Sequence, residues 1–192
     1  GRNVILLILV TAMTLWLGFG TAPLMLSSQT LWKYPFQRAY IGLYHNITEP
    51  DWFPDFEGDV KGEYEFDYLA SMLQGTGHYS VYFETDEETV KRYNEDFSKQ
   101  AKYSFELSQY ESGSIYDGSI PELDKKRAGN EYIELDLYLG KHYGDVSFGD
   151  IPEGMGNVTV YVLDSNLDFD KPHTSAVFID SEKNTVFLSR LG

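Results

Sequence analysis

The longest apolar run of the chain lies close to its N-terminus. Residues 4–26 read VILLILVTAMTLWLGFGTAPLML and contain no charged side chain, and about 20 such residues cross the hydrocarbon layer of a bilayer as a helix. The alternatives are a buried core helix and a cleaved signal peptide, which Pro23 disfavours because it follows the best cleavage site, Gly20-Thr21-Ala22. The run therefore predicts a single transmembrane helix, and we assign residues 1–30 to this anchor.

Aromatic and basic residues gather in the segment that follows. Amphipathic rings beside cations are typical of the lipid head-group region, and the alternative is that these rings join the globular core. We assign residues 31–55 to a membrane-proximal aromatic segment and linker, which ends in the turn-rich sequence from Glu49 to Pro54. The predicted membrane-interface residues are Trp32, Lys33, Tyr34, Phe36 and Arg38.

Alternation of apolar and polar residues marks the strands of the remaining domain, residues 56–192. Residues 62–68 (GEYEFDY) and 78–84 (HYSVYFE) have the period of two of a strand with one wet face, and residues 131–139 (EYIELDLYL) show it most clearly. Residues 157–163 and 174–180 are apolar enough for inner strands, and residues 185–189 follow a four-residue loop that fits a hairpin. Short connections between consecutive strands predict antiparallel pairing.

One helix is predicted between these strands. Thr85 and Glu88 have the spacing of a capping box, and apolar residues follow at helical spacing from Val90 to Phe97. The end of this helix is not marked, because residues 103–107 then alternate as in a strand. We therefore expect an α+β domain, an antiparallel sheet of five to seven strands with one principal helix on a face, preceded by the single transmembrane helix.

The composition is that of a folded, acidic domain. Apolar residues make up 42% of the 192 residues and aromatic residues 16%, which excludes general disorder. Residues 49–192 hold all 30 acidic residues against 12 of the 15 basic ones, a formal charge of −18. This surface repels nucleic acid, because such binding rests on cations that neutralise phosphates.

The charges beside the apolar run bear on orientation. Only Arg2 precedes the run, against Lys33 and Arg38 after it, so the positive-inside count is nearly tied. A short N-terminal tail before a large acidic domain is the usual single-span arrangement, and we expect the C-terminal domain to be extracytoplasmic. The chain contains no cysteine, which excludes disulfides and cysteine-based metal or catalytic sites. From this composition we expect the protein to lie in a bacterial cell membrane.

A short acidic stretch has the spacing of the start of a calcium-binding loop. Oxygen-bearing side chains recur at alternate positions in residues 164–170 (DSNLDFD), which lets one turn converge on an ion. Phe169 stands where that loop needs glycine and Ser175 where it needs glutamate, so a solvated acidic loop is the alternative. The candidate ligands for weak calcium binding are Asp164, Asn166, Asp168 and Asp170, and no other cofactor is expected.

The sequence contains no strong catalytic signature. The four histidines occur singly, so a zinc site could assemble only through folding. The stretch from Gln74 to Gly77 lacks the third glycine and the lysine of phosphate-binding loops. Neither a Gly-x-Ser-x-Gly elbow nor a Ser-x-x-Lys pair occurs, and we therefore expect a protein that is not an enzyme.

We expect a membrane-anchored extracytoplasmic domain that acts as a binding or accessory module of a membrane or envelope complex. Its expected partners are the lipid bilayer and another membrane or envelope protein. An anchored hydrolase of cell-envelope polymers and a calcium-dependent structural or adhesive domain are the alternatives. Interface hot spots favour tyrosine, as strands also do, and the candidate partner-binding residues are Tyr79, Tyr82, Tyr110 and Tyr116.

Overall fold

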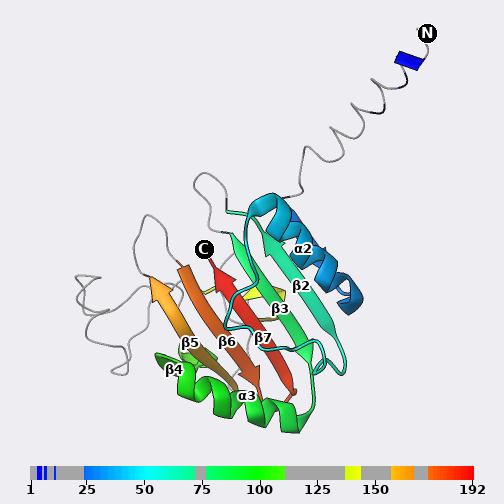
Figure 1. Cartoon of the computed structure of the whole chain (residues 1–192). Coiled ribbons are helices and arrows are strands. Elements are labelled where there is room, and N and C mark those ends of the chain that lie inside the picture. Colours follow the sequence, from blue (N-terminus) through cyan, green and yellow to red (C-terminus); the bar gives the residue numbers. More distant parts are fainter. Residues whose placement is uncertain are drawn as a thin grey trace.

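The chain forms one antiparallel sheet with helices on one face (Figure 1). A computed structural model of the protein describes residues 4, 5, 7, 11, 24–71, 77–110, 137–143, 157–166 and 173–192. In this part of the chain the strand order is β1-β2-β3-β7-β6-β5-β4, so the last strand in sequence, β7, lies at the centre. The strands are β1 (Met25–Ser28), β2 (Tyr64–Leu69), β3 (His78–Glu84), β4 (Tyr103–Glu106), β5 (Val158–Asn166), β6 (His173–Asp180) and β7 (Thr185–Leu191).

Two helices, α2 (Tyr34–His45) and α3 (Glu87–Gln100), cover one face of the sheet, which we call the helix face. Tyr34 of α2 packs edge-on against Phe66 of β2, with ring centroids 5.4 Å apart. α3 contacts β5 and β6 and buries Tyr93 and Phe97 against them. The short helix η1 (Leu31–Lys33) leads directly into α2. Of the two cores formed by the described residues, the larger lies on this face.

Strand alternation separates the helix face from the opposite one, which we call the second face. In β2, Tyr64, Phe66 and Tyr68 are buried on the helix face, so Glu65 and Asp67 project from the second face. Between β5 and β7 the second face is apolar. Its core is covered by residues 137–143, which include α5 (Gly140–Tyr143), and by η2 (Leu107–Gln109). Toward β2 and β3 the second face becomes polar.

The start of α3 lies one residue from the predicted position. Asp86 is the N-cap, and its Oδ1 accepts a hydrogen bond from the Thr89 amide at 2.8 Å. The Thr85 hydroxyl, which we expected in that role, donates to the Asp59 carbonyl oxygen at 2.6 Å instead. β4 begins at Tyr103, soon after α3 ends, so the strand-like pattern that obscured the end of the helix was itself correct.

The predicted α+β class and the antiparallel sheet are confirmed, with seven strands, but three details were wrong. α2 is a second helix, similar in length to α3, and it lies in the segment assigned to the linker. Tyr34 and Ile41 give this helix its buried side. β1 starts at Met25, inside the run assigned to the anchor, and pairs with β2 along its whole length. Residues 137–139, the described part of the strand predicted at 131–139, are not a strand.

The predicted transmembrane run falls largely on residues without a described structure. None of the helices formed by the described residues is long and apolar enough to cross a membrane. Residues 12–23, more than half of the apolar run, lie outside the described residues. The transmembrane helix therefore stays a prediction.

Candidate functional site

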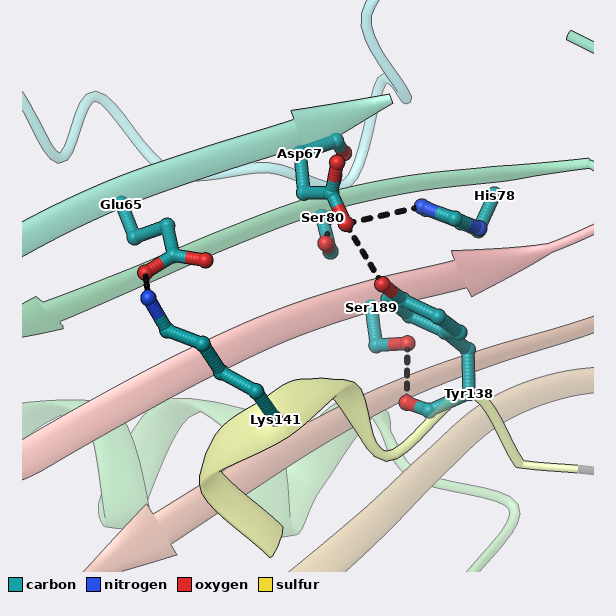
Figure 2. Close-up of polar contacts among 7 residues, drawn as sticks. All are labelled: Glu65, Asp67, His78, Ser80, Tyr138, Lys141 and Ser189. Carbon is teal, nitrogen blue, oxygen red and sulfur yellow. Dashed lines mark hydrogen bonds and ion pairs between the residues drawn. The ribbon is translucent and has the colours of Figure 1, made fainter. Parts of the chain in front are cut away.

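Polar side chains gather on the second face, where β2, β3 and β7 lie side by side (Figure 2). Glu63 directly precedes β2, and Glu65 and Asp67 follow at alternate positions, so the three carboxylates project from one face. The strand register places Asp67 opposite Ser80 of β3, and Ser80 opposite Ser189 of β7. We call this group the second-face cluster, and its members are Glu63, Glu65, Asp67, His78, Ser80, Tyr138, Lys141, His142 and Ser189.

Residues 137–143 bring three members of the second-face cluster over the sheet. Gly140 has a φ of +59°, and a Cβ atom at this position would lie 3.0 Å from the ring of Phe187. The chain can therefore turn this close to β7 only with glycine. Ser189 Oγ donates a hydrogen bond to the Tyr138 carbonyl oxygen at 2.9 Å. This bond fixes the segment to the centre of the sheet.

Asp67 is the acceptor in the first half of the second-face cluster. Its Oδ2 accepts a hydrogen bond from Tyr138 OH at 2.6 Å and lies 3.1 Å from His78 Nε2. The rings of His78 and Tyr138 stack with centroids 3.7 Å apart. Burial by itself raises the pKa of Asp67, but the hydrogen bonds from His78 and Tyr138 outweigh it and hold this pKa below its usual value. Asp67 is therefore ionised at neutral pH, and its charge is satisfied by its neighbours.

Glu65 occupies the centre of the other half. Its Oε2 forms an ion pair with Lys141 Nζ and lies 3.4 Å from His142 Nε2. The His142 ring stacks on Tyr82 with centroids 3.6 Å apart and an angle of 6° between the planes. Burial lowers the pKa of His142, and the attraction of Glu65 opposes this effect without cancelling it. The imidazole of His142 is therefore neutral at neutral pH.

Three members of the second-face cluster can offer ligand atoms to a metal ion. One atom each of Glu63, Glu65 and His142 lie within 4.8 Å of one another, and no other trio of acidic and histidine side chains in the described ranges is placed in this way. Carboxylate oxygens and imidazole nitrogens both bind divalent metal ions. The arrangement is therefore able to hold a cation.

The Asp67–His78 pair has no serine hydroxyl of the second-face cluster placed for nucleophilic catalysis. Nucleophilic catalysis requires a hydroxyl group within hydrogen-bond reach of the base. Ser80 Oγ donates to the Asp67 carbonyl oxygen at 3.3 Å, and Ser189 Oγ donates to Tyr138, as described above. Neither serine of the second-face cluster is bonded to His78. The described contacts therefore do not form a serine–histidine pair, and the hydrolase alternative stays untested.

The tyrosines predicted to bind a partner are buried. Tyr79, Tyr82 and Tyr110 are 3%, 9% and 8% exposed. Tyr79 belongs to the core of the helix face, and the other two belong to the core of the second face. The prediction is wrong for these three residues, because their side chains pack in the two cores; Tyr79 and Tyr82 also reflect the strand preference of tyrosine. Tyr116 lies outside the described residues.

The predicted calcium loop is only partly described. β5 continues through Asn166, so the first residues of the expected loop are extended. Asp164 already has two side-chain partners, since Lys102 Nζ lies 2.5 Å from its Oδ1 and His173 Nε2 lies 3.3 Å from its Oδ2. Asp168 and Asp170 lie outside the described residues, and calcium binding stays a prediction.

The predicted membrane-interface residues divide between core and surface. Tyr34 is fully buried, and its OH group donates to Glu49 Oε1 at 2.5 Å. Arg38 NH1 donates to Glu49 Oε2 at 2.6 Å. The interface assignment is therefore wrong for Tyr34, which joins the core, as the alternative interpretation had it. The other four predicted residues, Trp32, Lys33, Phe36 and Arg38, are exposed and lie outside the core, and Arg38 alone of them pairs with Glu49.

Sequence patterns indicated only half of the second-face cluster. Alternation identified the acidic residues of β2 as the solvent-facing side of a predicted strand. His142 was not predicted as a site residue, because no other histidine lies near it in the sequence. Its signal was Gly140, which ends the apolar alternation of residues 131–139 and allows the chain to turn onto the sheet. A glycine at the end of such a pattern is a typical sign of close backbone approach.

Comparison with known proteins adds no assignment to these observations. No family model, no curated protein and no solved structure matches the chain. The function is therefore inferred from the contacts and exposed surfaces of the described residues.

Proposed function

We propose that the protein is a membrane-anchored, non-enzymatic binding module of the bacterial cell envelope, with its acidic domain on the extracytoplasmic side. In this proposal the apolar residues before β1 cross the bilayer, and the outer side of α2 lies on the bilayer surface. The observation that supports it is a row of apolar side chains that α2 leaves uncovered.

The uncovered row runs along the side of η1 and α2 that faces away from the core. Trp32, Phe36 and Leu43 are 67%, 69% and 77% exposed, whereas Tyr34 and Ile41 in the same segment are fully buried. The helical spacing of the first three residues places them on one side. We call Trp32, Phe36 and Leu43 the α2 stripe.

The lipid bilayer is the occupant that best fits the α2 stripe. All large hydrophobic side chains exposed in the described ranges lie between Val4 and Tyr44, so this surface is continuous in sequence with the apolar run. About 20 uncharged residues remain before β1, which is enough for one span. Lys33 Nζ lies 5.8 Å from the centre of the Trp32 ring, a pairing that suits an amphipathic helix at a lipid surface. All acidic residues follow residue 48, so the N-terminal end is the part best suited to approach lipid.

Quenching of tryptophan fluorescence by brominated lipids tests where the α2 stripe lies. The chain has three tryptophans, and the substitutions Trp16→Phe and Trp52→Phe leave Trp32 alone. In liposomes we expect strong quenching of Trp32. The matched control carries Trp16→Phe and Trp32→Phe and keeps Trp52, which packs against the core of the helix face and should be quenched much less. Equal quenching of the two residues would overturn the bilayer contact.

Insertion and orientation are tested on the same full chain. Alkaline carbonate should leave the protein in the membrane fraction and release the variant Leu9→Lys/Leu15→Lys, because each lysine at the centre of a span costs about 3 kcal/mol of insertion free energy. Protease added to intact cells should digest the C-terminal domain. Release of the unsubstituted chain by carbonate would contradict the anchor, and protection of the domain would contradict its orientation.

A further inference from the structure

We propose that Glu63, Glu65 and His142 form a binding site for one divalent transition-metal ion, with zinc as the ion that fits best. The site lies on the second face, on the side of the sheet opposite α2. It does not depend on the contact between the α2 stripe and lipid, and it goes beyond the proposed function.

The first support is the distance between two of the ligand atoms. Zinc forms bonds of about 2.0–2.1 Å in tetrahedral geometry, so two of its ligand atoms lie roughly 3.3–3.4 Å apart. Glu65 Oε2 and His142 Nε2 are 3.4 Å apart. The Glu63 carboxylate completes a trio within 4.8 Å and lies on the exposed side. Three protein ligands leave a fourth position for water or an external ligand.

The second support is that His142 Nε2 is buried and makes no hydrogen bond within the described part of the chain. Buried polar atoms in folded proteins nearly always have a partner, and an unpaired one calls for a specific explanation. Glu65 Oε2 is also inaccessible to solvent, and its partner is the Lys141 ammonium group. A metal ion between the two atoms would satisfy His142 Nε2 and replace the ammonium group on Glu65.

The surrounding contacts hold His142 in place before any ion binds. Its ring lies flat on Tyr82, which the β2–β3 register places directly opposite Glu65. The next residue, Tyr143, is buried, with its OH group 3.2 Å from Thr185 Oγ1. Ligands held by neighbouring contacts lose little freedom when a metal binds, and such supporting contacts typically improve metal affinity.

Lys141 competes with the metal ion for Glu65. Its ammonium group pairs with the Glu65 oxygen that points to His142 and neutralises it in the metal-free protein. The Lys141 side chain is 52% exposed, and it can therefore move into solvent when an ion arrives. Removal of this lysine should tighten metal binding, whereas removal of a purely structural lysine would not.

Nitrogen ligation favours zinc over calcium or magnesium. Calcium takes six to eight oxygen ligands, and magnesium also prefers oxygen. Imidazole suits zinc, copper, iron and nickel. Asp67 is not available as a further ligand, because His78 and Tyr138 already occupy its carboxylate. A site of two carboxylates and one imidazole therefore suits zinc.

Calorimetric titration of the full, tag-free chain with zinc chloride tests the proposal. The protein is stripped with EDTA, kept in detergent micelles, and compared with three variants of equal circular dichroism. We expect one zinc ion per chain, about tenfold weaker binding for His142→Gln, and about fivefold tighter binding for Lys141→Met. The matched control, His173→Gln, removes a histidine from the exposed pair with Asp164 and should bind zinc like the unsubstituted chain.

Three results would overturn the site. The first is the absence of zinc binding at millimolar concentration by the unsubstituted chain. The second is unchanged affinity in His142→Gln, and the third is an equal loss in His173→Gln. Glu63→Gln serves as an additional carboxylate variant, because Glu63 is exposed and should lose zinc affinity without unfolding, and unchanged affinity in this variant would exclude Glu63 as a ligand. The tryptophan-quenching result is unaffected by any of these outcomes, so failure of the metal site and failure of the bilayer contact are distinguishable.

Discussion

Glu65 and Asp164 each face one lysine and one histidine, and the two groups differ mainly in burial. Glu65 pairs with Lys141 and lies 3.4 Å from His142, and Asp164 pairs with Lys102 and lies 3.3 Å from His173. The acid and histidine are 12% and 18% exposed in the first group, against 52% and 40% in the second. We call the first the buried group and the second the exposed group.

Burial changes what the same three side-chain types can do. In the exposed group, water solvates each charge, and an ion pair of this kind contributes little to stability. In the buried group, the closest oxygen and nitrogen atoms are inaccessible to solvent; Lys141 pairs with the Glu65 oxygen, and His142 Nε2 makes no hydrogen bond within the described residues. In composition the two groups are alike, since each contains one acidic residue, one lysine and one histidine. The structure identifies only the buried group as a candidate metal site. The predictions below test this difference.

The largest expected difference in stability concerns Tyr82, whose ring stacks on His142 of the buried group. Tyr82→Ala removes the ring under His142 from the core of the second face, and we expect a loss of about 3 kcal/mol in the free energy of unfolding. His173→Ala in the exposed group should stay within about 0.5 kcal/mol of the unsubstituted chain. Urea unfolding of the EDTA-treated protein, followed by circular dichroism, measures both. Losses of similar size would show that burial does not separate the groups.

A smaller difference is expected when each lysine is removed. Lys141→Ala leaves the mostly buried Glu65 carboxylate without its cation, and we expect a loss of about 1–2 kcal/mol, less than for a fully buried pair because Lys141 is half exposed. Lys102→Ala should cost about 0.5 kcal/mol or less. The measurement is thermal unfolding without metal. A larger cost for Lys102→Ala would reverse the comparison.

The smallest effect concerns the exposed group and low pH. Burial opposes ionisation of Asp164 and is the largest single influence on its pKa, but the hydrogen bonds and attraction of Lys102 and His173 together outweigh it and hold this pKa below its usual value. Because the folded pKa is the lower one, this contribution to stability is present above about pH 4 and is lost as the pH falls through the folded pKa. Asp164→Asn should remove only this part of the acid dependence, by about 0.5 kcal/mol or less after screening by salt.

Unfolding curves between pH 5 and pH 2 measure this contribution. Repeating them in high salt should shrink the difference between Asp164→Asn and the unsubstituted chain, since solvent-exposed charges are screened. A difference that grows with salt would contradict the assignment of Asp164 to an exposed pair.

Most strands could be predicted from the sequence, β2 and β3 from alternation and β5, β6 and β7 from short apolar runs next to turn residues. β2 and β3 lie almost where the alternation of residues 62–68 and 78–84 placed them. β1 was missed because its four residues are at the end of a long apolar run, which dominates any short pattern. α2 was missed for another reason. Tyr34 and Phe36 have the same kind of side chain, yet the first is fully buried and the second is 69% exposed, and only packing against β2 distinguishes them.

The candidate site depends on a contact that sequence patterns do not encode. The carboxylates of Glu63 and Glu65 follow from the alternation of β2, but His142 reaches them from a segment far along the chain. Its position is set by the turn at Gly140 and by stacking on Tyr82. A lone histidine carries no such information, because the pairing arises from tertiary structure alone.

The central place of β7 has a consequence for synthesis of the chain. β1, β2 and β3 form one antiparallel group and β4, β5 and β6 another, and β7 alone is hydrogen-bonded to both. A nascent chain that has emerged only as far as β6 therefore holds two half-sheets, with β3 and β6 each presenting an unpaired edge. Such edges attract other strands and promote aggregation. The seven residues Thr185–Leu191 close both of these edges in one step, so the two half-sheets are protected at β3 and β6 only after this strand has been synthesised and has paired with both.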